Sequence, residues 1–260
     1  MRILTCVKYV PDAGDDVGFD DDLTLTRTGG SSKLSELDEY AVEQALRLRS
    51  ELDGVTVTVL SVGPTEAETA LRKALQMGAD EAVLVSDPVI AGSDVFGTAA
   101  VLAAAARTLD GVGLILCGMS STDAGLGVVP ALLADELGWP LLSNAAVLAV
   151  EAGTARISRV DETGSRVVEA EVPAVVSVTD QSGEPRYPSF KDVLAAKKKT
   201  VTELTVADLG IDPSSVGAGA ARVEVLGVAR NPEREVGRVI VDVDGSSVDE
   251  IVAFLATATN

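Results

Sequence analysis

The sequence predicts an α/β fold with a doubly wound, mostly parallel sheet, a small antiparallel extension and a C-terminal arm. Three observations support this prediction. Short apolar runs alternate with segments of helical spacing through the first half of the chain, an order that places helices on both faces of a parallel sheet. After about residue 140, shorter segments alternate apolar and polar residues, as half-buried antiparallel strands do. From about residue 197 onward, long apolar elements become sparse.

The first half contains the runs that we expect to form parallel strands. They are Ile3–Val7, Val55–Val62, Ala82–Val85 and Gly113–Cys117. The helices that the spacing indicates are Leu37–Leu46, Leu71–Leu75, Ala99–Leu109 and Ala131–Leu137. Ser35 and Ser93 stand where N-caps are expected, and Gly78 stands where a helix ends in a left-handed conformation.

The second half predicts a different arrangement. The segments expected to form the antiparallel extension are Ala145–Val150, Ala155–Val160 and Arg166–Glu171, and the apolar run Pro173–Val178 is typical of a buried strand. Near the end, Val248–Leu255 has its apolar residues on one helical face, which must dock on its own domain or on another chain. We therefore expect an α/β domain over residues 1–200 and a C-terminal arm over residues 201–260.

Composition excludes several functions. The chain has 260 residues, with 21 Lys and Arg against 40 Asp and Glu, and its formal net charge is −19. This charge argues against binding of a nucleic-acid backbone as the main function, and an aromatic content of 3% argues against base-stacking platforms. Histidine is absent, so this chain alone supplies no Ser-His-Asp or Cys-His nucleophile and no His-ligated metal site.

Cysteine content and hydropathy predict a cytoplasmic protein. Cys6 and Cys117 are too few for a disulfide framework, and we expect reduced, buried thiols. No apolar run approaches the roughly 20 residues that span a bilayer, and the first residues lack the pattern of a signal peptide.

The most informative loop extends from Gly118 to Pro130 and opens the helix Ala131–Leu137. It is rich in Gly, Ser and Thr. Glycines let a backbone approach an anion closely, and N–H groups at a helix N-terminus attract a phosphate. Because neither GxGxxG nor GxxxxGK[ST] is present, an ordinary strand-to-helix loop remains the alternative. Asp123 is expected either to accept a hydrogen bond from a nucleotide or to cap the helix.

Four other segments bear on function. Lys8–Pro11 and Ser61–Pro64 follow strands and are expected to converge on the same crevice. The acidic stretch Asp12–Asp22 lacks the calcium-loop pattern, so we expect a solvated loop. Gly183–Lys191 places two aromatic residues between prolines, and the basic Lys197–Lys199 follows. This last segment is either a partner-docking loop or a rigid surface turn.

At these segments the sequence resembles the β subunit of electron transfer flavoproteins. The matching blocks span roughly residues 1–200 and are, in order, Val7–Asp12, Asp38–Ala45, Arg72–Asp80, Thr122-Asp123, Leu137–Pro140, Val172–Val176, Glu184–Phe190 and Ala195–Lys199. The third block and the last two are the most specific to this family.

The resemblance implies a heterodimer in which an α subunit carries a redox-active FAD. This chain would form a Rossmann-like, adenine-nucleotide-binding domain that holds a structural AMP, and its arm would dock on the α subunit. The pair would accept electrons from acyl-CoA and related dehydrogenases of fatty acid β-oxidation and pass them to a membrane quinone oxidoreductase. Residues implied to contact AMP are Cys6, Ser35, Glu36, Leu37, Asp38, Val62, Gly118, Met119, Ser120, Ser121, Thr122, Asp123, Ala124, Gly125, Leu126, Gly127, Val128 and Val129. Residues implied to anchor the partner dehydrogenase are Tyr187, Pro188, Ser189, Phe190 and Lys191.

The chain departs from the family pattern in three places. Ser35-Glu36 replaces a common Asn-Pro, Arg159–Gly164 keeps only part of an Arg-Glu-x-Asp-Gly-Gly signature, and Phe190 replaces a common leucine. Bifurcating members of the family bind a second FAD in place of AMP, and the sequence allows either ligand in this chain. The alternative from another class is a nucleotide-binding regulator like the universal stress proteins. An adenylating enzyme is disfavoured because its S-G-G-x-D-S loop is absent.

Overall fold

The computed structural model describes residues 1–12, 18–27, 31–229, 237, 239–242, 245 and 247–258. The chain divides into one unit over Met1–Leu226 and a second over Gly227–Asn260.

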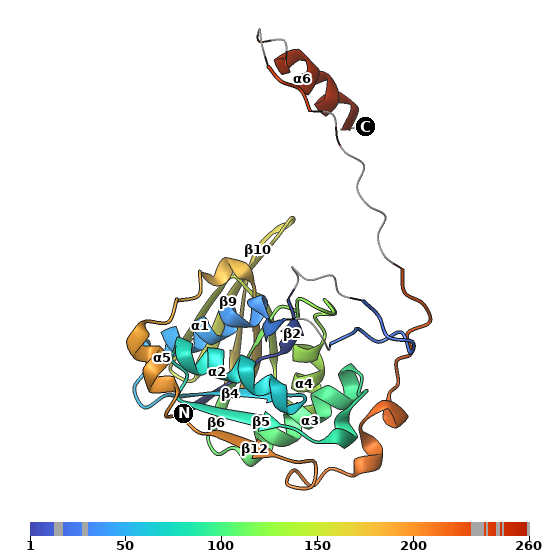
Figure 1. Ribbon diagram of the computed structural model, residues 1–260. Helices are drawn as coiled ribbons and strands as arrows, with labels where there is room; N and C mark the ends of the chain where they lie inside the picture. Colours follow the sequence, from blue (N-terminus) through green and yellow to red (C-terminus); the bar gives the residue numbers. More distant parts are fainter. Residues whose placement is uncertain are drawn as a thin grey trace. The chain divides into compact units, whose positions relative to one another are not determined.

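A seven-stranded parallel sheet forms the centre of the first unit (Figure 1). Its strands in spatial order are β12 (Val201–Leu204), β5 (Glu81–Val85), β4 (Thr56–Val62), β1 (Arg2–Cys6), β6 (Val112–Gly118), β11 (Ala174–Val178) and β7 (Leu141–Ala145). From β1, the chain first builds the sheet outward through β4 and β5, and then builds the other side from β6. The winding therefore reverses between β1 and β6, which confirms the doubly wound α/β fold.

Helices cover both faces of this sheet, because successive strand residues are buried on opposite sides. Ile3 packs into one core cluster and Leu4 into the other, and Leu114 and Ile115 alternate in the same way. The helices of the first cluster are α1 (Glu36–Glu51) and α2 (Glu68–Met77), with α5 (Phe190–Ala196) packed against α2. The helices of the second cluster are α3 (Val95–Thr108) and α4 (Val129–Leu137), which pack against each other.

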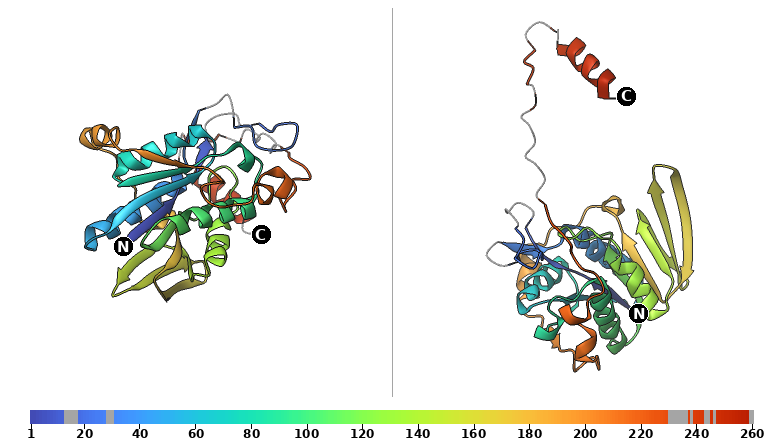
Figure 2. Two further views of the ribbon diagram at one scale, coloured as in Figure 1. Left: turned by 90° about the horizontal axis from the view of Figure 1, so that it is seen from below. Right: turned by 90° about the vertical axis from the view of Figure 1, so that its right-hand side faces the viewer.

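Two small antiparallel sheets complete the unit. The larger extends the fold beside β7 (Figure 2) and consists of β8 (Val147–Glu151), β9 (Thr154–Asp161) and β10 (Gly164–Glu171). The smaller pairs β2 (Tyr9–Pro11) with β3 (Ser32–Leu34). Leu148 and Ile157 carry the first core cluster into the larger sheet. The predicted antiparallel extension is therefore present.

The structure divides one predicted strand and adds others. The segment 145–150 is not a single strand, because β7 ends at Ala145 and β8 begins at Val147 in the other sheet. The chain changes sheets next to Asn144, whose φ is +58°. The sequence does not predict β2, β3, β7, β12 or α5, because elements this short show too few periods of hydrophobic alternation.

Asp94, and not Ser93, is the N-cap of α3. Its Oδ1 accepts hydrogen bonds from the backbone N–H groups of Phe96 and Gly97, both at 3.0 Å. Its Oδ2 accepts the N–H groups of Arg222 at 2.6 Å and Val223 at 3.1 Å. One carboxylate thus fixes both the start of α3 and the last segment of the first unit.

The domain boundary expected at residue 200 falls at Leu226 instead. Residues 201–204 form β12 and pair with β5, and Val206 and Val216 are buried in the second core cluster. In the second unit, the predicted C-terminal helix is α6 (Ser247–Ala258), and its hydrophobic residues are exposed. Of the acidic stretch 12–22, residues 13–17 lie outside the described residues, and Asp20, Asp21 and Asp22 are exposed. None of the described helices has the length and hydropathy needed to cross a membrane.

The bifunctional cap predicts the effect of Asp94→Asn. The amide oxygen can still accept from Phe96 and Gly97, but the NH2 group would face the N–H donors of Arg222 and Val223. We expect faster hydrogen exchange at these two amides, a free energy of unfolding lower by about 1 kcal/mol, and unchanged exchange at the start of α3. Asp212→Asn is the control, because Asp212 caps only its own turn through Ser214. Equal exchange at Arg222 in wild type and Asp94→Asn would contradict the prediction.

Candidate functional site

The candidate site lies where the winding reverses, at the carboxyl ends of β1 and β6. These strands are neighbours in parallel register, and open α/β sheets bind ligands at such a point. Lys8 follows β1, and residues 119–128, called here the β6–α4 loop, follow β6. The N-terminus of α1 is the third element, because Ser35 and Asp38 contact both of these segments.

The Asp38 carboxylate links the carboxyl ends of β1 and β6 by hydrogen bonds. Its Oδ2 accepts the backbone N–H of Lys8 at 2.8 Å, and the N–H of Gly118 also hydrogen-bonds to the carboxylate. A Cβ at position 118 would lie 2.6 Å from Oδ1 of Asp38 and 2.7 Å from the carbonyl oxygen of Leu37, so this position requires glycine. Burial raises the pKa of Asp38 to about 7, against the opposing effect of its two hydrogen bonds.

Ser35 connects α1 to the β6–α4 loop. It occupies the expected N-cap position, but its hydroxyl makes no capping bond to the helix. Its Oγ instead accepts the backbone N–H of Thr122 at 3.4 Å. The neighbouring Glu36 pairs with Lys33 at 2.7 Å. The family resemblance implies that both residues contact AMP. The structure joins Ser35 to the β6–α4 loop, whereas the Glu36 side chain pairs with Lys33.

Asp123 holds two cations beside the loop. Its side chain is only 1% exposed and pairs with Lys8 at 2.9 Å and Arg27 at 2.5 Å. Burial by itself would raise the pKa of Asp123, but the charge of Lys8 and hydrogen bonds from Ser121, Lys8 and Arg27 hold it well below its usual range. The N-cap of α4 is Val128. The expectation that Asp123 caps this helix is therefore wrong.

The β6–α4 loop leaves a run of backbone donors at the start of α4. Gly125 and Gly127 both have φ of +65°, and the N–H of Gly125 closes a turn on the carbonyl of Ser121 at 3.0 Å. Within the described part of the chain, the N–H groups of residues 126–129 have no protein acceptor. Consecutive N–H groups at a helix N-terminus form a concave donor surface that favours an anion.

Several other residues at the carboxyl ends of the strands, most of them predicted to contact the nucleotide, are apolar or carry thiols. Cys6 and Cys117 are buried, free thiols on adjacent strands. The Cys117 thiol donates a hydrogen bond to the Cys6 sulfur, and this bond together with burial raises the pKa of Cys117, so it stays protonated and unreactive. Val62 ends β4 nearby, and Met119 lies exposed at the start of the loop.

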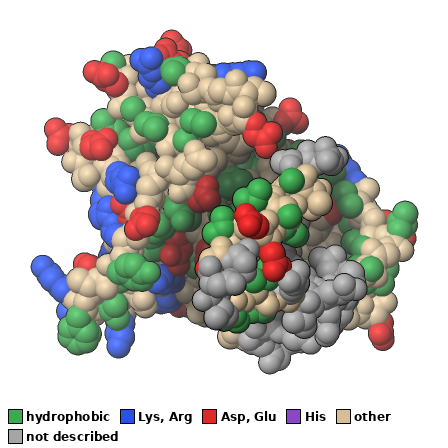
Figure 3. All heavy atoms as spheres, turned by 90° about the horizontal axis from the view of Figure 1, so that it is seen from above, with side chains coloured by type: hydrophobic (Ala, Val, Ile, Leu, Met, Phe, Trp, Pro, Cys, Tyr) green, Lys and Arg blue, Asp and Glu red, His purple; other side chains and the backbone are tan. Residues whose placement is uncertain are grey.

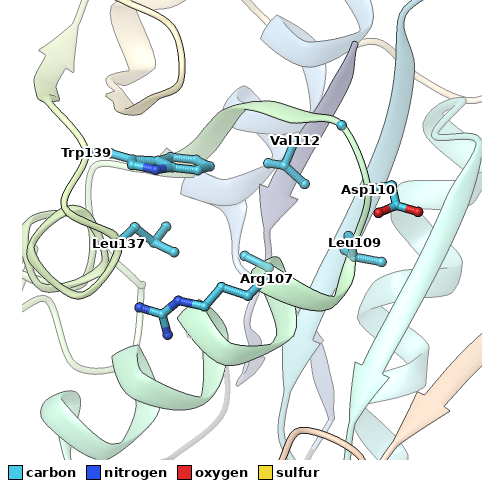
Figure 4. A pocket seen from close by; sticks show the side chains of 8 residues that line it. Arg107, Leu109, Asp110, Val112, Leu137 and Trp139 are labelled. Atoms are coloured by element: carbon cyan, nitrogen blue, oxygen red, sulfur yellow. The ribbon is translucent and has the colours of Figure 1, made fainter.

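A separate pocket lies at the other edge of the sheet (Figure 4). Its volume is about 240 Å³, and it lies between the ends of α3 and α4 and the start of β6, where Arg107, Val112, Leu137 and Trp139 line it. Ligands of doubly wound sheets bind at the opposite, carboxyl edge. This pocket contains none of the residues that the sequence predicts for binding.

The segment 184–191, called here the docking segment, combines an anchored base with an exposed tip. The carboxylate of Glu43 on α1 accepts hydrogen bonds from Nε of Arg186 at 2.7 Å, from its backbone N–H at 3.2 Å, and from Nε of Arg47 at 2.9 Å. Burial opposes the charge of Glu43, but the two arginines lower its pKa. At the tip, Tyr187 is 95% and Phe190 is 79% exposed.

Exposed lysines accompany this tip in the sequence, at positions 191, 197 and 198. Figure 3 shows Lys and Arg beside hydrophobic side chains at the lower left of the view, the side on which α5 lies in Figure 1. Ser189 and Asp192 form a capping box that begins α5 at Phe190.

The sequence does not predict the role of Glu43. The feature of the sequence that could have indicated this role is a glutamate among the apolar positions of an amphipathic helix.

Comparison with known proteins decides the family. The sequence matches the family model described as "Electron transfer flavoprotein domain" over residues 22–209. The chain belongs to the electron transfer flavoprotein family. It is 42% identical over 259 residues to the electron transfer flavoprotein subunit beta of Mycobacterium leprae (strain TN), with 98% of this chain and 97% of that protein covered.

Two more distant relatives belong to reductase systems. The Caffeyl-CoA reductase-Etf complex subunit CarD of Acetobacterium woodii is 32% identical over 258 residues, covering 99% of this chain and 97% of that protein. The Acryloyl-CoA reductase electron transfer subunit gamma of Anaerotignum propionicum is 30% identical over 259 residues, covering 97% of each. The resemblance found in the sequence is thus confirmed, and electron transfer is the function that this β-subunit family shares.

The buried Asp38 predicts a pH dependence of stability. Its pKa is about 7 in the folded chain, against 3.8 for an unperturbed aspartate, so the folded state binds the proton more tightly. The stability that this proton binding contributes is full at low pH and is lost as pH rises from about 4 through about 7. In Asp38→Asn the side chain is neutral at every pH. We expect the free energy of unfolding of the variant, relative to wild type, to increase between pH 4 and pH 7 in urea titrations.

The control for this prediction is Asp53→Asn, which changes an exposed carboxylate near the end of α1. It should follow the wild-type pH dependence. Parallel curves for wild type and Asp38→Asn would show that Asp38 does not gain a proton in this range.

Proposed function

We propose that this chain is the β subunit of a heterodimeric electron transfer flavoprotein that holds AMP at the β6–α4 loop and docks dehydrogenases through residues 187–191. The observation that carries the nucleotide assignment is the run of free N–H groups at residues 126–129, beside the reversal of winding. Membership of the family supports the electron-carrying role.

Local charge favours a phosphate at this loop. Lys8 and Arg27 supply two positive charges and Asp123 one negative charge, so this cluster is positive within a chain of net charge −19. The phosphate of AMP would accept from the N–H groups of residues 126–129. Adenosine would lie against residues 35–38 and Val62, which the family resemblance implies as AMP contacts.

The chain's own residues bind and orient rather than react. The FAD of the α subunit supplies the redox chemistry when bound. In this proposal the pair receives electrons from acyl-CoA and related dehydrogenases and passes them to a quinone oxidoreductase, in the cytoplasm. The exposed residues of α6, including Val248, Ile251 and Phe254, would dock on the α subunit, which would bury the face that an isolated amphipathic helix cannot bury.

The docking segment fits the role of a protein-binding anchor. The bonds from Arg186 and Arg47 to Glu43 fix its base, so little conformational freedom is lost when a partner covers the tip. Exposed aromatic residues beside basic ones are typical of interface hot spots. Lys191 directly follows Phe190 and Lys197 follows the end of α5; both are exposed and favour a partner with an acidic surface.

The nucleotide assignment predicts what denaturation releases. The purified α–β complex should yield one AMP and one FAD per heterodimer when its extract is separated by chromatography. Two FAD and no AMP would instead support the bifurcating alternative. A homodimer that binds ATP without a partner chain would support the universal-stress-like regulator.

A glycine variant tests the loop in the same assay. Gly127→Ala strains a residue with φ of +65° and should lower the AMP content while the FAD content stays unchanged. Gly153→Ala is the matched control, because Gly153 has φ of +82° in the turn between β8 and β9. Equal AMP content in the two variants would contradict this assignment.

The docking segment predicts the effect of Phe190→Ala. Truncation of an aromatic anchor typically costs at least about 2 kcal/mol of binding, so kcat/KM for electron acceptance from an acyl-CoA dehydrogenase should fall roughly 30-fold. The FAD content should stay at the wild-type level. Phe19→Ala, which removes another exposed phenylalanine (44%), should leave the rate unchanged. Equal rates of flavin reduction in Phe190→Ala and wild type would exclude this anchor.

A further inference from the structure

The β9–β10 hairpin carries two arginines that the proposed function does not use. Arg159 and Arg166 lie directly opposite each other in the antiparallel register. The next pair on the same face, Ile157 and Val168, packs in or against the first core cluster. The hairpin rises beyond the neighbouring elements in both upright views (Figures 1 and 2). The arginine pair therefore continues the buried face of the hairpin past the end of the core.

This pair lacks the partners that two cations need. Two like charges directly opposite on paired strands destabilise each other. Nε of Arg159 is buried without a hydrogen-bond partner, and within the described residues neither arginine forms an ion pair. A buried, unpaired donor of a charged group has a high cost in free energy.

The acid on the same face does not remove this imbalance. Asp161 follows Arg159 by two residues, and its carboxylate accepts hydrogen bonds from the backbone N–H of Thr163 at 2.8 Å and from the Thr163 hydroxyl. Its charge interacts with Arg166, but one carboxylate held in a turn faces two guanidinium groups. The face keeps a positive charge.

Other arginines of this chain show that such pairing is available to it. Arg47 and Arg186 share Glu43, and Arg49 pairs with Asp80 at 2.7 Å. On the opposite face of the same hairpin, Arg156 on β9 pairs with Glu169 on β10 at 3.3 Å. With 40 acidic residues in the chain, the unpaired Arg159 suggests that its anion comes from outside.

We propose that Arg159 and Arg166 together bind a carboxylate side chain of the partner subunit. This proposal rests on the proposed function, because the carboxylate belongs to the other subunit of the heterodimer. A guanidinium group binds a carboxylate through two parallel hydrogen bonds, and one carboxylate between two guanidiniums would satisfy Nε of Arg159 and offset the repulsion. A second copy of this chain is a poor source, because two chains of net charge −19 repel each other.

The other face of the hairpin supports a protein partner over a free anion. Val147, Val160 and Val167 lie on that face and are 60%, 54% and 57% exposed. A protein chain that reaches the arginines can also cover these valines, whereas phosphate cannot. The hairpin therefore offers a positive site on one face and exposed valines on the other.

The first test is a zero-length cross-link in the purified heterodimer. Arg159→Lys places a primary amine at this position, and a carbodiimide joins amines to carboxylates that touch them. Mass spectrometry should find the amine at position 159 bonded to an Asp or Glu of the partner subunit. In the matched control, Arg156→Lys should bond to Glu169 of its own chain. Cross-links from position 159 only within this chain, or to a second copy of it, would overturn the proposal.

The second test measures subunit association. Arg159→Gln and Arg166→Gln should each raise the dissociation constant of the heterodimer roughly 10-fold or more, and the double variant should lose less than the product of the two, because both bind one carboxylate. Arg156→Gln should stay within about twofold of wild type. Wild-type association in both single variants would overturn the proposal while the proposed function stands. Failure of the wild-type chains to form an FAD-containing heterodimer would instead overturn the proposed function.

Discussion

The reversal of winding between β1 and β6 is the constraint on which the rest of this molecule depends. Two parallel strands that leave a sheet side by side must diverge to opposite faces, and their ends expose backbone N–H groups that need acceptors. The buried carboxylate of Asp38 accepts from Lys8 and Gly118 and so holds the two ends together. Glycine at position 118 is required because the Asp38 carboxylate leaves no room for a Cβ.

A single helix then connects the two functional surfaces. The N-terminus of α1 supplies Ser35 to the β6–α4 loop and Asp38 to the strand ends. Two turns later, Glu43 holds Arg186 at the base of the docking segment. The candidate nucleotide site and the docking segment are therefore positioned by one rigid element. In the proposed function, a bound AMP would support the partner-docking surface through this helix without taking part in the redox chemistry.

Local clusters of charge, rather than the net charge, characterise the proposed binding surfaces of this chain. The net charge of −19 gives no indication of the two positive charges beside the β6–α4 loop, of the lysines near Phe190 or of the arginine pair on the β9–β10 hairpin. Each of these lies at a surface where an anion or an acidic protein is proposed to bind. Because screening limits such effects to about 8 Å at physiological ionic strength, local clusters determine recognition more than the total does.

The sequence by itself determined the long strands, the helices between them and the family, because hydrophobic periodicity and the specific blocks are local properties of the chain. It also placed the Gly-rich loop after β6. Only the tertiary structure decided that Asp123 holds Lys8 and Arg27 rather than capping α4, that Glu43 anchors the docking segment, and that the first unit extends to Leu226. These outcomes depend on contacts between residues far apart in the chain. Glu43 and Arg186 are separated by 143 positions, and no local pattern records that they meet.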